Sequence, residues 1–243
     1  LQVCLKYSFT TETDLFLILD LMTGGDLGFH LGNRGRFSSM EAKYFAARTL
    51  LGIAHLHEHY IVYRDLKPEN ILMDENGFTK ISDLGLACQV VPHLVGTCGT
   101  RGYWAPDMLR RDSKGKRIPY NQTVDWFSFG CVIYEFLCGV SPFRTERAKT
   151  WGGMEKKDKD KAIDRATLEM EPEFDESFDD DARDICIRLL DKDPSTRLGT
   201  RGVREIMDHP WFNILNWDDI MSDRVVPPFK PKKDINAEIG RAS

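Results

Sequence analysis

The run YRDLKPEN at residues 63–70, followed by DLG at 83–85, constrains this chain more than any other feature. Between them lies ILMDENGFTKIS, residues 71–82, in which two apolar runs flank the turn-forming pair Asn76-Gly77. This pattern predicts a short β-hairpin. The chain must therefore fold so that a polar loop and a second acidic segment meet at neighbouring strand ends.

Four side chains in these segments have the types that phosphoryl transfer needs, because that reaction relies on positioning and charge neutralisation. Asp65 is placed to accept the proton of an attacking hydroxyl, a role that typically contributes roughly 10²–10⁴-fold in rate. Lys67, two residues on, can reach the transferred phosphate. Asn70 and Asp83 offer the oxygen ligands that Mg²⁺ prefers. The spacing therefore predicts a phosphoryl-transfer site.

Taken singly, each of these residues has an ordinary structural interpretation. A lone Asp in a loop is usually a turn residue or helix cap. Asn70 alone would be a satisfied loop amide, and Lys67 alone a surface charge. Together they favour the phosphoryl-transfer interpretation, because YRDLKPEN and DLG rarely occur by chance in one chain with a short hairpin between them.

Composition favours a folded protein of one large domain or two small ones. The chain has 243 residues, of which 42% are hydrophobic and 29% charged. A net charge of −5 argues against nucleic acid as a partner. Its six cysteines include no CxxC pair, which argues against a zinc site and for a reducing compartment. No signal peptide is visible, and no apolar run approaches the roughly 20 residues of a membrane span. We therefore expect a cytoplasmic protein without a transmembrane segment.

Periodicity outlines the remaining elements. Residues 2–9 and 14–21 are typical of two strands, with a polar turn between them. Residues 38–60 are expected to be helical, because Ser38 and Glu41 have the spacing of a capping box. From about 125 to 215 the pattern is mostly helical, and 124–140 is expected to be a buried helix.

Two charged segments interrupt this pattern. Residues 144–162 are mixed in sign and broken by glycine, and are expected to form a loop with a helical end. The sequence RRDSKGKR, residues 110–117, is strongly basic. It is either a solvated loop, which we favour, or a contact for a membrane or an acidic partner.

The chain resembles the large lobe of a eukaryotic protein kinase, of the serine/threonine type and the AGC group. Tyr63 before Arg-Asp is usual in that group, and Lys67 in DLKPEN is a serine/threonine mark. Several segments resemble the G-protein-coupled receptor kinases: LDLMTGGDL at 19–27, DLGLA at 83–87, GTRGYWAPD at 99–107, VDWFSFGC at 124–131 and KDPSTRLG at 192–199. HPWF at 209–212, NWDDI at 216–220 and VPPFKP at 226–231 are similar to the start of the AGC tail.

This resemblance implies an α+β, protein-kinase-like fold, mainly helical, with a remnant of the N-terminal lobe β-sheet. Residues 1–22 would be the end of the small lobe, 23–212 the large lobe, and 213–243 the start of the tail. It also implies an ATP- and Mg²⁺-dependent enzyme that phosphorylates Ser/Thr hydroxyls of proteins, including activated G-protein-coupled receptors. Membrane association would come through segments that are absent from this chain.

The resemblance also assigns nucleotide contacts. The backbone of Asp20 and Met22 would hydrogen-bond the adenine, and Asp26 would contact the ribose. Leu72 would form the apolar floor under the base. Asp83 would hold the metal bound to the phosphates.

Further residues have implied structural or regulatory roles. Arg64 would pair with groups on the activation segment, residues 83–107, and Asp125 would brace the catalytic loop. Asp107 and Arg197 would form an ion pair, which we expect to be loose because the family usually has the longer Glu at 107. Thr100 would bridge the catalytic base and its Lys.

Regulation by phosphorylation and the choice of substrate each have two interpretations. The position that is phosphorylated in many AGC kinases is Gly96 here, with Thr97 one residue away. We favour a segment that needs no phosphate. Glu69 and Glu135 are either ordinary charges at the cleft edge or an indication of basic residues near the target hydroxyl. Receptor kinases, in contrast, tolerate acidic surroundings. These two indications conflict.

The sequence lacks a Gly-rich loop of the GxGxxG type and the strand Lys of a complete kinase. Two functions are therefore weighed. One is a serine/threonine kinase with Asp65, Lys67, Asn70 and Asp83 in the roles given above. The alternative is a truncated, non-catalytic kinase-lobe module that binds partners. The presence of all four of these polar residues favours the first function. The lack of a Gly-rich loop over the phosphates favours the second.

Overall fold

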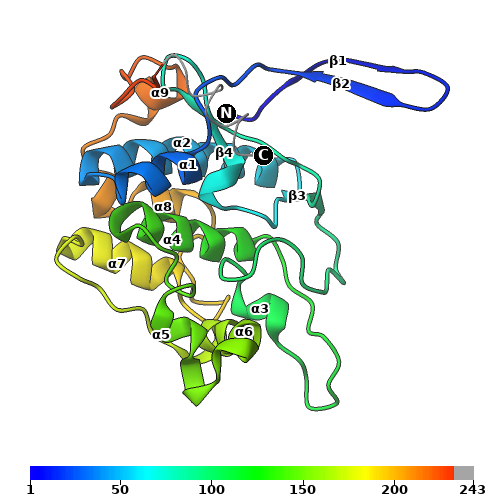
Figure 1. The fold of residues 1–243 in the computed structure, drawn as a ribbon, viewed down its shortest axis with the longest axis vertical. Helices are drawn as coiled ribbons and strands as arrows, with labels where there is room; N and C mark the ends of the chain where they lie inside the picture. The colour runs from blue at the N-terminus through cyan, green and yellow to red at the C-terminus, as the bar shows by residue number, and fades with distance from the viewer. Residues whose placement is uncertain (233–243) are drawn as a thin grey trace.

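The computed structural model describes residues 1–232, in which helices predominate and three two-stranded sheets are small (Figure 1). The strands are β1 Leu5–Thr10, β2 Leu15–Leu19, β3 Ile61–Val62, β4 Ile71–Met73, β5 Thr79–Ile81 and β6 Cys88–Gln89. The α-helices are α1 Leu27–Arg34, α2 Ser39–Glu58, α3 Pro106–Leu109, α4 Thr123–Cys138, α5 Glu146–Lys149, α6 Lys159–Glu169, α7 Asp180–Leu189, α8 Arg204–Met207 and α9 Trp217–Met221. Short 3-10 turns occupy Pro68–Asn70 (η1), Trp151–Gly153 (η2), Lys156–Asp158 (η3) and Pro210–Phe212 (η4).

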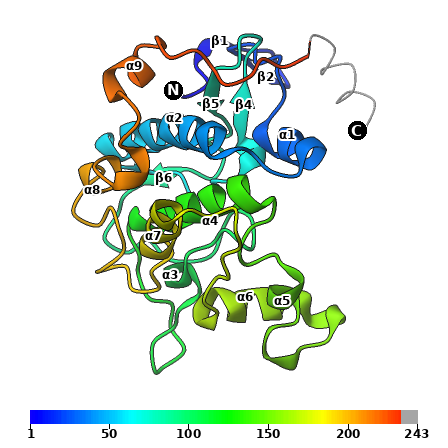
Figure 2. The same cartoon turned by 90° about the vertical axis from the view of Figure 1, so that its left-hand side faces the viewer.

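The core lies around α2 and α4, which run through the middle of the molecule (Figure 2). The expected capping box begins α2: Glu41 N–H donates to Ser38 Oγ, and Ser38 N–H donates to Glu41. Helix α4 is buried on nearly all sides, as its apolar sequence predicts. Its C-terminus is closed by Gly139, which adopts the left-handed conformation that glycine tolerates best.

The predicted hairpin forms between β4 and β5, with Ile71 paired to Ile81 and Met73 paired to Thr79. Gly77 has φ 95° in the connecting turn, a value that favours glycine. The chain's first residues dock on this hairpin, because Ile81 N–H donates to Leu1 and Val3 N–H donates to Ile81.

A second hairpin, β1–β2, projects away from the helices (Figure 1). Every residue from Cys4 to Leu19 is solvent-exposed, although most of the large ones are apolar. Phe9 and Phe16 stack on one face, with ring centroids 4.8 Å apart. The predicted strand at 2–9 therefore divides: residues 1–3 bond to β5, and only 5–10 pair with β2.

The remaining expectations are largely confirmed. The helix predicted over 38–60 spans Ser39–Glu58, and that over 124–140 spans Thr123–Cys138. The charged segment 144–162 contains short helical turns and the start of α6. Beyond α9 the chain returns across α1, where Phe229 packs on His30 and under Arg34. Residues 233–243 of the predicted tail lie outside the described residues. Within 1–232, no helix combines the length and apolarity that crossing a membrane requires.

Candidate active site

The predicted catalytic loop spans residues 63–70. One buried carboxylate holds the backbone N–H groups of its first two residues. Asp125, on α4, is fully buried and accepts hydrogen bonds from the N–H groups of Tyr63 and Arg64, both at 2.8 Å. Its Oδ2 also lies 2.8 Å from His57 Nε2. Arg64 adopts φ 70°, a region that non-glycine residues seldom enter. The contacts from Asp125 therefore stabilise a strained turn just before Asp65.

Three donors converge on the carboxylate of Asp65. Thr100 Oγ1 lies 2.8 Å from Oδ1, while Lys67 Nζ and Asn70 Nδ2 lie 3.1 and 3.0 Å from Oδ2. Lys67 also donates to Thr100 Oγ1 at 2.7 Å. Asp65 and Asn70 are buried, whereas Lys67 and Thr100 are half-buried. One hydrogen-bonded cluster therefore unites Asp65, Lys67, Asn70 and Thr100, with the Asp65 carboxylate as the hydrogen-bond acceptor at its centre.

Asn70 and Asp83 flank the β4–β5 hairpin, as the sequence predicted. Ser82 N–H donates to the Asn70 carbonyl at 2.9 Å and thereby joins the two strand ends. Asp83 is exposed at φ 54°, and its Oδ1 accepts a hydrogen bond from Gly85 N–H.

A magnesium ion fits this donor set. Asn70 uses its amide nitrogen toward Asp65, which leaves the amide oxygen available, and Asp83 offers Oδ2. No group of three or more His, Cys, Asp or Glu side chains suited to a metal occurs within 1–232. Mg²⁺ is commonly held by one or two protein oxygens together with substrate phosphates. The pair therefore suits a metal that arrives with a nucleotide.

Next to Asp83 lies a cleft of about 640 Å³. Four of the five residues predicted to bind a nucleotide line it: Asp20, Met22, Leu72 and Asp83. Its other walls are mainly apolar: Val3, Leu5, Leu17, Leu19, Ile81, Ser82, Leu84 and Gly85. The volume is within the range of small-molecule sites, roughly 300–1,000 Å³.

The hinge of this cleft is the backbone of residues 20–22, which was predicted to hydrogen-bond the adenine. The side chain of Asp20 holds it in place. Its carboxylate accepts bonds from Lys6 and Lys80 at 2.8 and 2.7 Å and from Cys4 N–H. Hydrogen bonds from Lys6 and Lys80 hold the pKa of Asp20 well below its usual range. The Asp20 carbonyl and the Met22 N–H have no backbone partner within the described residues. Those two groups are therefore available to a ligand.

Asp26 is not among the residues that line the cleft. Its carboxylate caps α1 by accepting from Phe29 N–H at 2.8 Å, while its backbone pairs with Leu72. The backbone pairing with Leu72, the residue predicted to lie under the base, brings Asp26 to the rim of the cleft.

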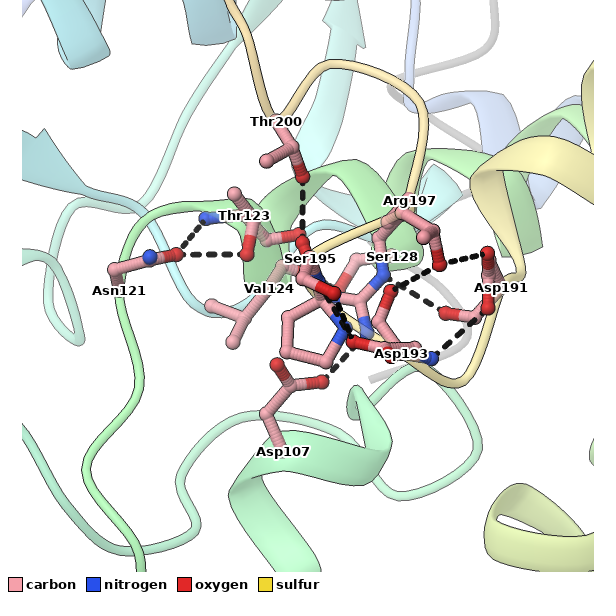
Figure 3. Close-up of polar contacts among 12 residues, drawn as sticks. Asp107, Asn121, Thr123, Val124, Ser128, Asp191, Asp193, Ser195, Arg197 and Thr200 are labelled. Atoms are coloured by element: carbon pink, nitrogen blue, oxygen red, sulfur yellow. Dashed lines mark hydrogen bonds and ion pairs between the residues drawn. The ribbon is translucent and has the colours of Figure 1, made fainter.

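Arg64 and Arg197 each contact the predicted activation segment, residues 83–107. Arg64 Nε donates to the Leu86 carbonyl at 2.8 Å, within that segment. Figure 3 shows Asp107 directed from α3 toward the cluster that contains Arg197, and Arg197 Nη2 lies 2.6 Å from Asp107 Oδ2. Arg197 also donates to the carbonyls of Asp191 and Thr123.

Sequence reasoning missed two pairings. His57 contacts Asp125 across 68 positions, and the Tyr103 hydroxyl donates to Glu135 at 2.5 Å. Burial raises the pKa of Glu135 to about 7. Glu135 is half-buried and accepts a hydrogen bond from Tyr103, so it is not a freely exposed charge at the edge of the cleft. Glu69, in contrast, is exposed.

Comparison with known proteins now decides the family. The protein kinase domain family matches residues 3–212. The chain belongs to the protein kinase family. It is 43% identical over 241 residues to Beta-adrenergic receptor kinase 1 of Rattus norvegicus, covering 97% of this chain and 33% of that protein. It is 41% identical over 242 residues to G protein-coupled receptor kinase 2 of Caenorhabditis elegans, covering 97% and 32%.

These comparisons confirm the resemblance to the receptor kinases within the AGC group and the mainly helical kinase-like fold. The chain spans about one third of the length of the curated relatives it matches. Protein kinases in general use ATP and Mg²⁺, which agrees with the oxygen ligands and the cleft found here.

Proposed function

We propose that this chain is the large lobe of an ATP-dependent serine/threonine kinase that transfers the γ-phosphoryl group to protein hydroxyls. The observation that carries the proposal is the Asp65 cluster, in which Lys67, Asn70 and Thr100 all contact one carboxylate. This cluster is joined to the nucleotide-sized cleft through Ser82, which lines the cleft and bonds to Asn70.

In this proposal Asp65 orients the substrate hydroxyl and accepts its proton. Thr100 and Lys67 hold the Asp65 carboxylate in place, and the Lys67 ammonium stabilises negative charge on the transferred group. Asn70 and Asp83 would hold Mg²⁺. The bound Mg²⁺·ATP supplies the phosphoryl group and neutralises part of its charge.

The hinge would bind the adenine through the Asp20 carbonyl and the Met22 N–H. Leu72 would pack under the base, and Asp26 would contact the ribose from the rim. Their support is the position of the cleft and the free backbone groups at the hinge.

The other assigned residues would position this site. Asp125 would fix the catalytic loop, Arg64 would link it to the activation segment, and Asp107–Arg197 would anchor the end of that segment. We propose residues 1–22 as the end of a small lobe, 23–212 as the large lobe and 213–243 as the start of a tail.

We extend the proposal to the substrate class through the names of the relatives. Proteins 41–43% identical to this chain are named as kinases of receptors. We therefore propose protein substrates that include activated G-protein-coupled receptors, and action from the cytoplasm at the membrane that holds them.

Calorimetry with the 243-residue chain tests the site. Mg²⁺·ATP should bind, and Asp83→Asn should raise its Kd by at least about tenfold, a loss of roughly 1.4 kcal/mol. Asp65→Asn should bind the nucleotide normally but lower transfer to a serine peptide by roughly 10²–10⁴-fold. Unchanged affinity in Asp83→Asn would refute the metal assignment. A wild-type chain that neither binds nor transfers would favour the partner-binding alternative.

A further inference from the structure

The basic segment 110–117 forms a hairpin after α3 that is exposed over residues 111–116, with Arg110 and Arg117 half-buried at its base. Arg111 and Arg117 pair across it, Asp112 N–H donates to the Lys116 carbonyl at 2.8 Å, and Gly115 N–H donates to the Asp112 carbonyl at 2.9 Å. In both views the segment after α3 projects from the end of the molecule opposite the β1–β2 hairpin (Figures 1 and 2). It is therefore accessible to another macromolecule.

The hairpin concentrates positive charge. It contains five basic side chains, Arg110, Arg111, Lys114, Lys116 and Arg117, and one carboxylate, that of Asp112, for a net charge of +4. Asp112 Oδ1 accepts from the backbone N–H groups of Lys114 and Lys116, both at 2.9 Å. The carboxylate thus organises the turn. Within residues 1–232, none of the five cations lies within 4.0 Å of a carboxylate in an ion pair.

Ser113 lies at the tip of this hairpin and is exposed. Arginines precede it by three and two positions. Its hydroxyl makes no hydrogen bond within the described part of the chain, whereas the exposed Ser195 and Ser222 both donate, to Asp193 and to the Asp218 carbonyl. The Ser113 hydroxyl is therefore both reachable and uncommitted.

We propose that Ser113 is a phosphoryl-acceptor site for a serine/threonine kinase whose peptide-binding cleft carries carboxylates. Arg110 and Arg111 would pair with those carboxylates and bring the hydroxyl to the catalytic base, because kinases select substrates largely by charge pattern. Ser113 Oγ forms a bond to the γ-phosphorus of a nucleoside triphosphate. The bond from that phosphorus to the bridging oxygen breaks, the nucleoside diphosphate leaves, and the hydroxyl proton passes to the acting kinase's base.

The hairpin can present this serine at low cost. Its few backbone bonds are solvent-exposed, and segments of that kind open locally with little free energy. Opening also frees Arg111, whose Nη1 donates to the Gly115 carbonyl at 2.9 Å in the closed hairpin. An extended RRDS segment would then be available to the other kinase.

Phosphorylation would change the hairpin itself. A phosphate adds about −1.5 to −2 charge and three acceptor oxygens. Placed among Arg111, Lys114 and Lys116, it would reduce the net charge of +4 by roughly half and form charge-assisted hydrogen bonds. We therefore expect the modified hairpin to resist trypsin better than the unmodified one.

The test uses the complete 243-residue chain with Mg²⁺ and labelled ATP, with and without an arginine-directed serine/threonine kinase. Mass spectrometry should place one phosphate at Ser113. Ser113→Ala should abolish that incorporation, while Ser222→Ala, an exposed serine with acidic residues before it, should leave it unchanged. Arg110→Gln combined with Arg111→Gln should lower the rate by about tenfold or more.

A synthetic RRDSKGKR peptide is the positive control. If the kinase modifies this peptide but not the folded chain, the hairpin hides Ser113 and the proposal fails. Equal incorporation into Ser113→Ala would also overturn it. Incorporation without added kinase would identify the chain's own lobe as the donor enzyme and still support the acceptor site. The acceptor role does not depend on the activity proposed for this chain.

Discussion

Arg197 Nη2 lies 2.6 Å from Asp107 Oδ2, and both side chains are almost completely buried. A single N–O contact joins them, and it is short, whereas the shorter Asp predicted a loose pair. The other guanidinium nitrogens donate to the carbonyls of Asp191 and Thr123. Arg197 is thus satisfied on three sides. It connects α3, the start of α4 and the segment after α7.

Removing Asp107 should therefore destabilise the fold strongly. Asp107→Ala leaves the buried guanidinium without its counter-charge, which typically costs about 3–5 kcal/mol. Urea unfolding followed by fluorescence would measure this as a lower midpoint at unchanged slope. Asp107→Glu, which keeps the charge and lengthens the reach, should stay within about 1.5 kcal/mol of the wild type. A loss below about 1 kcal/mol in Asp107→Ala would contradict the pair's anchoring role.

Asp125→Asn should weaken the catalytic loop more than the hinge. The Asn amide has one uncharged acceptor oxygen, so it can accept from Tyr63 N–H or from Arg64 N–H but not from both as the carboxylate does. We therefore expect a loss of about 1.5–3 kcal/mol in stability. Phosphoryl transfer should fall further than Mg²⁺·ATP affinity, because the loop carries Asp65 and the hinge lies elsewhere. Asp181→Asn, an exposed change on α7, is the control. Equal losses in transfer and affinity would contradict this separation.

The elements that sequence reasoning located are those with local signals. Ser38 and Glu41 lie three residues apart, and Asn76-Gly77 marks its turn directly, so α2 and the β4–β5 hairpin could be predicted. Asp65, Lys67 and Asn70 fall within one loop, so their contact could be predicted from their spacing in the sequence. The resemblance to a known family was needed for Thr100 and Asp125, since their partners are distant in sequence.

What could not be predicted depends on how distant segments pack. Tyr103 and Glu135 are 32 positions apart, and only the docking of the activation segment on α4 brings them together. The same packing makes Glu135 a half-buried carboxyl that accepts a hydrogen bond from Tyr103. Burial of an acid cannot be inferred from its neighbours in sequence, because it is set by what covers it.

Glu135 should give stability a measurable pH dependence. Burial raises its pKa from the ordinary 4.5 to about 7, so the folded protein keeps a proton that the unfolded chain has lost. Stability from this group is therefore full below about pH 4.5 and falls as pH rises toward 7, by roughly 3 kcal/mol.

Glu135→Gln removes that titration and preserves an acceptor for Tyr103. The variant should gain stability relative to wild type as pH rises from 5 to 7.5 in urea unfolding. Glu69→Gln, at an exposed position, should show no such trend. A constant difference between Glu135→Gln and wild type across this range would refute the assignment.

Lys192 should give stability a pH dependence of the opposite sign to that of Glu135. Its Nζ is buried without a hydrogen-bond partner in the described residues and lies 4.2 Å from the Phe143 ring centre. Burial lowers its pKa from 10.5 to about 8. Between these two values the unfolded chain binds the extra proton, so the contribution of Lys192 to stability rises with pH.

Lys192→Met should therefore be more stable than wild type at pH 7, by up to about 3 kcal/mol less the lost cation–π contact. This advantage should shrink as pH approaches 9.5. Thermal unfolding at several pH values would show it, with Lys114→Met on the exposed basic hairpin as the control. An advantage that does not change with pH would mean that Lys192 does not titrate in this range.

The β1–β2 hairpin should make the chain associate. Tyr7 is 73% exposed and pairs with Ile18, and Phe9 pairs with Phe16. These four apolar side chains share one face, and both outer strand edges are open within the described structure. Exposed apolar faces and unpaired edges favour contact between chains. Light scattering during gel filtration should therefore show oligomers whose population rises with protein concentration.

Lysines on that face should return the chain to a monomer. Tyr7→Lys with Ile18→Lys places two like charges on the apolar face, so approach of a second copy becomes unfavourable. The opposite face, which contributes Leu5, Leu17 and Leu19 to the cleft, is left intact, so Mg²⁺·ATP affinity should not change. Val226→Lys alters an isolated residue of similar exposure and should leave association as it was. A wild-type chain that elutes as a monodisperse monomer at all concentrations would contradict the prediction.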